Sequence, residues 1–242
     1  MKRLLCALCC AVMTAAAWGE GAPEIPRFST AAAGGALPAG WKHLPLASFK
    51  NNTEYTLVSE DGAVVVQATA HNAASFLATK TDFDPHQLPM LSWRWKVKNG
   101  IPTANTAEQS KEDAPARVMV AFDGDMSKLS AKDRFAAKAA QSISGIGLPY
   151  ATLMYVWGGK VGLDSITASS RSARIKMLAV AVDEQGVGQW HSYSRNLVED
   201  FKRAFGEDPG RVLSIEIMTD TDNTGADAQT YYGDISVSAS KP

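Results

Sequence analysis

Cysteine is nearly absent from this 242-residue sequence, and all three cysteines lie within the first ten residues. In the same stretch, Lys2 and Arg3 precede an uncharged, apolar run, Leu4–Ala17, that ends in three alanines. A basic start, a short apolar run and small residues before a cleavage point are typical of a secretory signal peptide. We therefore expect residues 1–17 to be removed and the mature protein to start near Trp18. That mature chain has no cysteine, which excludes disulfides, thiolate metal sites and cysteine nucleophiles.

A strong charge of either sign is also missing. The full sequence has 24 basic and 25 acidic residues, and removal of Lys2 and Arg3 with the signal peptide leaves 22 against 25, a formal charge of −3. This balance argues against a general nucleic-acid binder, which has a basic excess or a basic stripe. After the signal peptide, no apolar run approaches the roughly 20 residues that a transmembrane helix needs. We expect a periplasmic or secreted protein without a transmembrane segment.

Common hydrolase motifs are absent, since the sequence has neither G-x-S-x-G nor H-E-x-x-H. Its four histidines are scattered without the spacing of metal ligands. A glycoside hydrolase, however, needs only two carboxylates about 5–10 Å apart. These could come from two of the four aspartates Asp113, Asp220, Asp222 and Asp234. A catalytic function therefore stays open.

Short β-type runs separated by turn signals fill most of the chain after Trp41. Residues 18–40, rich in Gly, Ala and Pro, are interpreted as a linker or a loosely packed arm. Residues 41–242 are interpreted as a single β-sandwich or barrel domain. The expected strands are Thr53–Ser59, Ala63–Ala70, Ser75–Thr79, Leu91–Lys98, Arg117–Phe122, Thr152–Trp157, Arg174–Val182, Gln189–Ser194, Val212–Thr219 and Tyr231–Val237. Asp61-Gly62 predicts a tight hairpin between the first two of them.

Two segments have a helical pattern, Ser127–Ser142 and Asn196–Phe205. In the second, apolar residues recur at i, i+4, i+7 and i+8, and Gly206 follows directly. We expect this helix to cover an edge or an end of the sandwich. Glu199 and Arg203 would then lie one turn apart and could form a surface ion pair.

Alternation along the strands separates an apolar face from a charged one. Trp93 and Trp95 share one face of their strand, which predicts that they point into the core. The outward positions of three strands carry charge instead. If these strands are neighbours, they form a ligand-binding surface of Arg94, Lys96, Arg117 and Glu216. A plain solvated face is the alternative.

The most distinctive acidic stretch runs from Met218 to Gly225. Asp220, Asp222 and Asn223 offer oxygen ligands of the kind that calcium prefers. The loop is not an EF-hand, because Tyr231 stands where the bidentate acid would be. The alternative is a turn in which these side chains bind the loop backbone.

A second acidic stretch, Lys111–Arg117, places Glu112 and Asp113 just before a strand. The first outward-facing residue of that strand is Arg117. A carboxylate and a guanidinium at the mouth of a strand can position a polar ligand. Asp113 is therefore a candidate ligand-binding residue, with an ordinary salt bridge to Arg117 as the alternative.

Several of these segments together resemble the bacterial family called domain of unknown function 3047. The matching residues are Leu91–Val97, Asp113–Phe122, Leu153–Trp157, Arg195–Gly206, Ile217–Gly225 and Tyr232–Ile235, in the expected order between Trp41 and Val237. The resemblance implies no established activity. It implies an all-β fold, a β-sandwich of the jelly-roll (galactose-binding-like) type with two short helices. Many carbohydrate-binding modules have this fold.

These observations predict an exported, non-catalytic binder of a glycan or another polar cell-envelope ligand, with calcium as a candidate cofactor. Some exposed aromatic side chains could stack on sugar rings, although most are expected in the core. The candidates are Trp41, Trp157, Trp190, Tyr231 and Tyr232. The alternatives are a glycoside hydrolase or lyase that uses paired aspartates, and a structural envelope protein that binds another protein.

Overall fold

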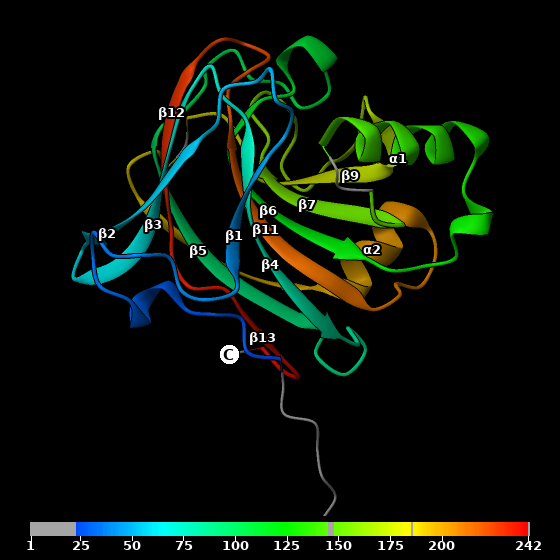
Figure 1. The fold of residues 1–242 in the computed structure, drawn as a ribbon, viewed down its shortest axis with the longest axis horizontal. Helices are drawn as coiled ribbons and strands as arrows, with labels where there is room; N and C mark the ends of the chain where they lie inside the picture. Colours follow the sequence, from blue (N-terminus) through cyan, green and yellow to red (C-terminus); the bar gives the residue numbers. More distant parts are fainter. Residues whose placement is uncertain (1–22, 145–147, 185, 242) are drawn as a thin grey trace, which may run out of the picture.

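Two β-sheets packed face to face make up the protein (Figure 1). The computed structural model describes residues 23–144, 148–184 and 186–241. The predicted signal peptide, residues 1–17, lies outside these residues. The fold is the jelly-roll type of β-sandwich that the sequence predicts, with two α-helices in the described part of the chain.

One sheet has seven strands in the order β1-β4-β11-β6-β7-β9-β8. Its strands are β1 (Trp41–Pro45), β4 (Ser75–Phe83), β6 (Ala114–Phe122), β7 (Ala151–Trp157), β8 (Ile166–Ser169), β9 (Ser172–Ala181) and β11 (Val212–Asp220). Neighbouring strands are antiparallel except β7 and β9, which are parallel. The antiparallel neighbours β6 and β11 lie in the middle of this sheet.

The other sheet has six strands, with β10-β5-β12-β3-β2 in order and β13 paired to β5 beyond the end of β12. Its strands are β2 (Glu54–Glu60), β3 (Ala63–His71), β5 (Met90–Asn99), β10 (Trp190–Asn196), β12 (Asp227–Tyr232) and β13 (Ser236–Ser238). The β2–β3 hairpin turns at Asp61 and Gly62, both with positive φ, as a two-residue turn of this kind requires. Between β12 and β13 the chain moves away from β5. Trp93 and Arg94 therefore lie between the β5 residues that pair with β12 and those that pair with β13.

Two α-helices lie on the side of the molecule where β9 runs (Figure 1). Helix α1 (Ala131–Ser144) begins after Ser130, whose Oγ accepts a hydrogen bond from the Asp133 amide at 3.1 Å. Helix α2 (Leu197–Phe205) is capped by Asn196 and ends at Gly206, which has a φ of 75°. Both helices confirm the sequence prediction.

Three short 3₁₀ turns complete the described elements: η1 (Phe28–Thr30), η2 (Gln109–Lys111) and η3 (Met126–Lys128). Within the part of the chain that the structure describes, no helix is long and apolar enough to cross a membrane.

Aromatic side chains of both sheets meet in the core. Trp93 and Trp95 are 3% and 0% exposed, which confirms that they point inward. The ring centroid of Trp93 lies 4.9 Å from that of Tyr155 in the facing sheet and 5.0 Å from that of Tyr193. Burial of such large rings supplies much of the hydrophobic stabilisation of the sandwich.

The segment 23–40 is not a linker or a loosely packed arm, contrary to the sequence interpretation. Ile25 and Phe28 are buried in the main core, and the Phe28 ring lies 4.8 Å from the Trp41 ring. Trp41 Nε1 also donates a hydrogen bond to the Pro26 carbonyl at 2.7 Å. Two isolated apolar residues produce no periodic pattern, so the sequence does not reveal this packing.

Candidate functional site

The predicted charged surface of four residues does not exist as one surface. Arg94 and Lys96 lie on β5 of the six-stranded sheet, whereas Arg117 and Glu216 lie on β6 and β11 of the seven-stranded sheet. The prediction that all four converge is therefore wrong. Period-two alternation shows which residues of a strand point outward, but it does not show to which sheet the strand belongs.

Arg117 is buried on the outer face of the seven-stranded sheet, with 3% of its surface exposed. Its Nη2 donates to Asp220 Oδ2 at 3.0 Å and to the Glu112 carbonyl. Its Nη1 lies 3.6 Å from the Met154 sulfur and 3.4 Å from the Met177 sulfur. A guanidinium enclosed by its own chain in this way has a structural role.

Glu216 also lies on this outer face, between Ala78 of β4 and Met119 of β6. Its carboxylate accepts a hydrogen bond from Ser214 Oγ at 2.8 Å. Burial raises the pKa of Glu216, because water no longer stabilises the charged form well. Among the described residues, none forms an ion pair with Glu216, so Glu216 is not part of a charged pair that could bind a ligand.

Three aspartates do come together at one end of the sandwich. We call Asp113, Asp220 and Asp222 the carboxylate cluster, since one oxygen of each can be chosen so that all three lie within 4.8 Å of one another. Asp113 precedes β6, Asp220 ends β11, and Asp222 is in the loop after this strand. Lys50 forms an ion pair with Asp222 Oδ2. Arg117 and Lys50 thus offset two of the three negative charges.

Asp113 anchors the loop after β11. It accepts hydrogen bonds from the Asn223 amide at 3.0 Å, the Thr224 amide at 2.7 Å and Thr224 Oγ1 at 2.6 Å. Gly225 then turns the chain with a φ of 67°, which favours glycine. The Asp113 carboxylate, from outside the loop, thus holds the loop, whereas the turn considered from the sequence has Asp220, Asp222 or Asn223 bind the loop backbone.

The predicted metal ligands Asp220, Asp222 and Asn223 do not all face one another. Asp220 and Asp222 lie together, but the Asn223 side chain donates to the Gln109 carbonyl at 3.0 Å, and Asp113 takes the third position. The Oδ1 atoms of Asp220 and Asp222 are buried without a hydrogen-bond partner in the described structure. Calcium binding therefore stays a prediction, with Arg117 and Lys50 already supplying positive charge.

The surroundings of Asp220 perturb its carboxyl group. Burial raises its pKa to about 7; Arg117 opposes this change, and the neighbouring Asp113 and Asp222 add to it. Asp227 and Asp234 do not join the cluster. Asp227 is an exposed partner of His71, and Asp234 binds Ser29.

Two salt bridges considered from the sequence do not form in the described structure. Asp113 accepts hydrogen bonds from the loop after β11 and does not pair with Arg117, whose carboxylate partner is Asp220. The Glu112 carboxylate accepts from Ser169 Oγ at 2.7 Å and from the Ser170 amide, so it does not pair with the Arg117 guanidinium. In α2, Arg203 pairs with Asp164 and Asp200 instead of Glu199. Arg117 pairs with an acid 103 residues away, which no local pattern predicts. Arg203 pairs with Asp200 at i,i+3, a spacing that a helix allows as well as i,i+4.

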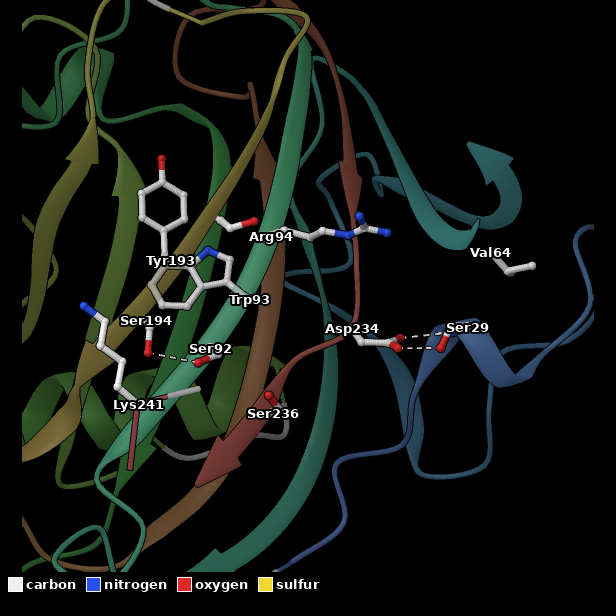
Figure 2. Close-up of a pocket in the computed structure, with 11 residues that line it drawn as sticks. Ser29, Val64, Ser92, Trp93, Arg94, Tyr193, Ser194, Asp234, Ser236 and Lys241 are labelled. Carbon is white, nitrogen blue, oxygen red and sulfur yellow. Dashed lines mark hydrogen bonds between the residues drawn. The ribbon is translucent and has the colours of Figure 1, made fainter. Parts of the chain in front are cut away.

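A groove of about 560 Å³ lies on the six-stranded sheet, where the chain between β12 and β13 departs from β5. We call it the serine groove, because five of its lining residues are serines. Its lining is Ser29, Val64, Ser92, Trp93, Arg94, Ser192, Tyr193, Ser194, Asp234, Ser236 and Lys241. Figure 2 shows the Arg94 side chain extending toward the side of the groove where Asp234, Ser29 and Val64 lie.

Hydrogen bonds tie the walls of the serine groove together. Asp234 accepts from the backbone amide of Ser29 at 3.0 Å and also from its hydroxyl, which joins η1 to the segment before β13 (Figure 2). On the opposite side, Ser92 Oγ donates to Ser194 Oγ at 3.1 Å, from β5 to β10. The groove is thus built on paired strands and a tethered turn, which gives its hydroxyl groups defined positions.

Lys96 lies two residues from Arg94 on the same face and is fully engaged by acids. It pairs with Glu60 and, at 2.8 Å, with Asp61. Hydrogen bonds from Lys96 and Trp190 lower the pKa of Asp61, and the bond to Asp61 raises the pKa of Lys96. Lys96 therefore fixes the β2–β3 hairpin against β5 and is not a free ligand contact.

Sequence reasoning found Arg94 and missed most of the groove. The alternation of Ser192, Tyr193 and Ser194 puts two small hydroxyl side chains on the outer face of β10, beside Arg94 and Ser92 of β5. That pattern was the available signal. Ser29 and Lys241 come from segments without any periodic pattern, and only the folded chain brings them to the groove.

Four of the five aromatic residues considered for sugar stacking are buried. Trp41, Trp157, Tyr231 and Tyr232 are at most 7% exposed. Trp190, at the start of β10, is only partly buried.

The chain belongs to the family described as "Protein of unknown function (DUF3047)", whose model matches residues 39–236. No curated protein matches the sequence. Among solved structures, the xyloglucanase domain of NopAA from Sinorhizobium fredii has 10% identity and a TM-score of 0.43, with 87% of this chain and 99% of that chain covered.

A family 30 carbohydrate-binding module from Clostridium thermocellum has 11% identity and a TM-score of 0.39, and 83% of this chain and 99% of that chain are covered. An adhesin domain of Lys-gingipain from Porphyromonas gingivalis has 12% identity and a TM-score of 0.37, with coverage of 90% and 99%. The family match establishes membership alone, because the family's description assigns no activity.

Proposed function

We propose that this protein is an exported, non-catalytic binder of a glycan or a similar polar cell-envelope ligand, and that the ligand occupies the serine groove. The observation that carries the proposal is the lining of this groove, with five serine hydroxyls, one arginine, one lysine and one aspartate in about 560 Å³. A polyhydroxylated ligand needs a dense set of donors and acceptors held by a rigid scaffold. Binding sites commonly combine such a cavity with a few fixed polar groups.

The arrangement of carboxylates favours binding over hydrolysis. Glycoside cleavage by the common mechanism needs two carboxyl groups that flank the bond. Within the described lining of the groove the carboxylate is Asp234, and it is hydrogen-bonded to Ser29. The carboxylate cluster is a separate group, and its members are held by Arg117, Lys50 and the loop backbone.

A glycan array tests the proposal. The exported protein, isolated from the periplasm or the medium, is expected to bind a defined class of glycan without releasing reducing sugar. Its intact mass should also lack residues 1–17. Release of reducing ends would favour the hydrolase alternative, and the absence of any glycan ligand would contradict the proposal.

A matched pair of variants locates the binding site. Ser192 is an exposed groove residue on β10, and Ser192→Tyr fills part of the groove without touching the core. Ser170, in the turn between β8 and β9, is exposed on the other sheet, so Ser170→Tyr is the control. We expect the first variant to lose at least tenfold in affinity and the second to bind normally. Normal binding by Ser192→Tyr would place the ligand elsewhere.

A further inference from the structure

Arg94 differs from the other arginines that the fold partly buries. In the described structure these are Arg94, Arg117, Arg174 and Arg195. Three of them have a carboxylate partner, at 3.0 Å for Arg117, 2.6 Å for Arg174 and 2.7 Å for Arg195. No carboxylate among the described residues forms an ion pair with Arg94, and none of their acceptors takes a hydrogen bond from its guanidinium.

The Arg94 guanidinium is nevertheless held in place. Its Cζ lies 4.5 Å from the centre of the Trp190 ring, a distance at which a cation is attracted to the ring face. Trp190 is itself fixed, because its Nε1 donates to Asp61 Oδ2 at 2.8 Å. Stacking occupies a face of the guanidinium plane, so the N–H groups around its edge stay available as donors.

Gly233 gives the Arg94 side chain its space. A Cβ atom at Gly233 would lie 2.7 Å from Arg94 Cγ and 2.8 Å from its Nε, closer than real contacts allow. The backbone also fixes this pair, because the Gly233 amide donates to the Arg94 carbonyl at 3.0 Å. The absence of a side chain at position 233 thus lets Arg94 lie along the groove.

The acids that could pair with Arg94 already have other partners. Hydrogen bonds from Lys96 and Trp190 hold Asp61 and lower its pKa, and the charge of Arg94 only adds to this effect. Asp234 lines the same groove, but its two carboxylate oxygens accept the amide and the hydroxyl of Ser29. Arg94 and Lys241 therefore give the groove lining one more positive charge than negative charge. A partly buried cation that makes no ion pair within the fold is stabilised when a ligand places an anion in direct contact with it.

We propose that the ligand of the serine groove is an acidic glycan, and that Arg94 binds the carboxylate of a uronic acid residue while the serines bind neighbouring hydroxyls. This inference rests on the proposed function. A planar carboxylate matches the fork of N–H donors on arginine, which lysine cannot reproduce. The preference for a charged over a neutral sugar chain would then come mainly from a single side chain.

The test compares ligands that differ only in charge. Galacturonate hexamer and its methyl-esterified form have the same backbone, and alginate hexamer supplies a second uronate chain. We expect the exported protein to bind at least one free uronate chain, and the acid form at least tenfold more tightly than the ester. Raising the salt concentration should reduce this preference.

Variants of the chain assign the preference to Arg94. Arg94→Gln is expected to remove the preference for the acid form, and Arg94→Lys to keep only part of it. Gly233→Ala retains the charge but displaces the Arg94 stem, and it should weaken acid binding as well. Arg171→Gln removes the same charge from an exposed turn of the other sheet and should leave binding unchanged.

The outcomes separate this inference from the proposed function. Equal binding of acid and ester, or an array that yields only neutral glycans, would overturn the inference and leave the proposed function standing. A preference that survives in Arg94→Gln would also overturn it. Failure to bind any glycan would overturn both.

Discussion

The carboxylate cluster and the serine groove both contain a partly or fully buried arginine, but the two arginines have different partners. In the cluster, Arg117 contacts Asp220 and the Glu112 carbonyl, so the chain itself supplies the acceptors. In the groove, Arg94 stacks on Trp190 and, within the described structure, forms no ion pair. The first arginine joins two strands and a loop, whereas the second presents its donors to the groove.

The difference separates charge used for folding from charge available for recognition. A buried ion pair whose partners come from distant parts of the chain holds those parts together, and removal of one partner leaves a costly unpaired charge. A cation without an internal partner adds little to the free energy of unfolding, since no pair is lost when it is replaced. Measurements of stability should therefore distinguish the two arginines sharply.

The largest effect is expected for Arg117→Met. At pH 8, where Asp220 is ionised, this variant leaves the buried carboxylate without its cation, and we expect the free energy of unfolding to fall by about 3–5 kcal/mol. Urea unfolding followed by tryptophan fluorescence measures it. The control Arg27→Met, at an exposed position before η1, should change stability by less than about 0.5 kcal/mol. A loss below about 1 kcal/mol in Arg117→Met would contradict a structural role for the pair.

The next effect is a pH dependence caused by Asp220. Because burial raises its folded-state pKa to about 7, the folded protein retains a proton that the unfolded chain releases above about pH 4. This carboxyl therefore lowers stability as the pH rises from about 4 to 7. Relative to Asp220→Asn, the wild type should lose on the order of a few kcal/mol across that window. Urea titrations at each pH measure the difference, and parallel curves for the two proteins would contradict it.

A smaller effect is expected from calcium at the carboxylate cluster. In the wild type, Lys50 and Arg117 already offset two of the three charges, so calcium and a chelator should give melting temperatures within about 1 °C of each other. In Lys50→Ala, the freed Asp222 carboxylate should let calcium raise the melting temperature by a few degrees, because the ion then stabilises the native state by mass action. Adding Asp222→Ala should abolish the shift. No response in Lys50→Ala would remove calcium from consideration.

The smallest loss of stability is expected for Arg94→Gln, at about 1 kcal/mol or less, because only the contact with the Trp190 ring is lost. Arg195→Gln is the matched comparison, since Arg195 is also partly buried in the six-stranded sheet but pairs with the buried Asp200. It should lose about 2–3 kcal/mol. Thermal or urea unfolding of the two variants side by side decides this. Similar losses in both would mean that Arg94 has a partner within the fold.

The sequence predicts most strands and both helices because each depends on local patterns. Alternation places Trp93 and Trp95 in the core, and Asn196 and Gly206 mark the ends of α2. Sheet membership depends on which strands pair, and this has no local signal. The distance between Arg94 on β5 and Arg117 on β6 therefore could not be predicted from their similar positions on amphipathic strands.

The residues of the candidate sites also divide into those with a local sequence pattern and those without one. Asp220 and Asp222 are distinctive as a motif, and the structure brings them together with Asp113. Lys50, which follows β1, and Ser29, which lies in η1, have no pattern that could indicate their positions beside acids more than 170 residues away. Single long-range contacts of this kind are determined by the whole fold.

The serine groove has a consequence for the order of events during synthesis. Its lining starts at Ser29 and ends at Lys241, and the tie between Ser29 and Asp234 joins residues 205 positions apart. A growing chain cannot complete the groove until the residues around Lys241 have left the ribosome. Unlike a site contained in one hairpin, this groove has no functional precursor in a partly made chain, so ligand binding reports that the whole domain has been assembled.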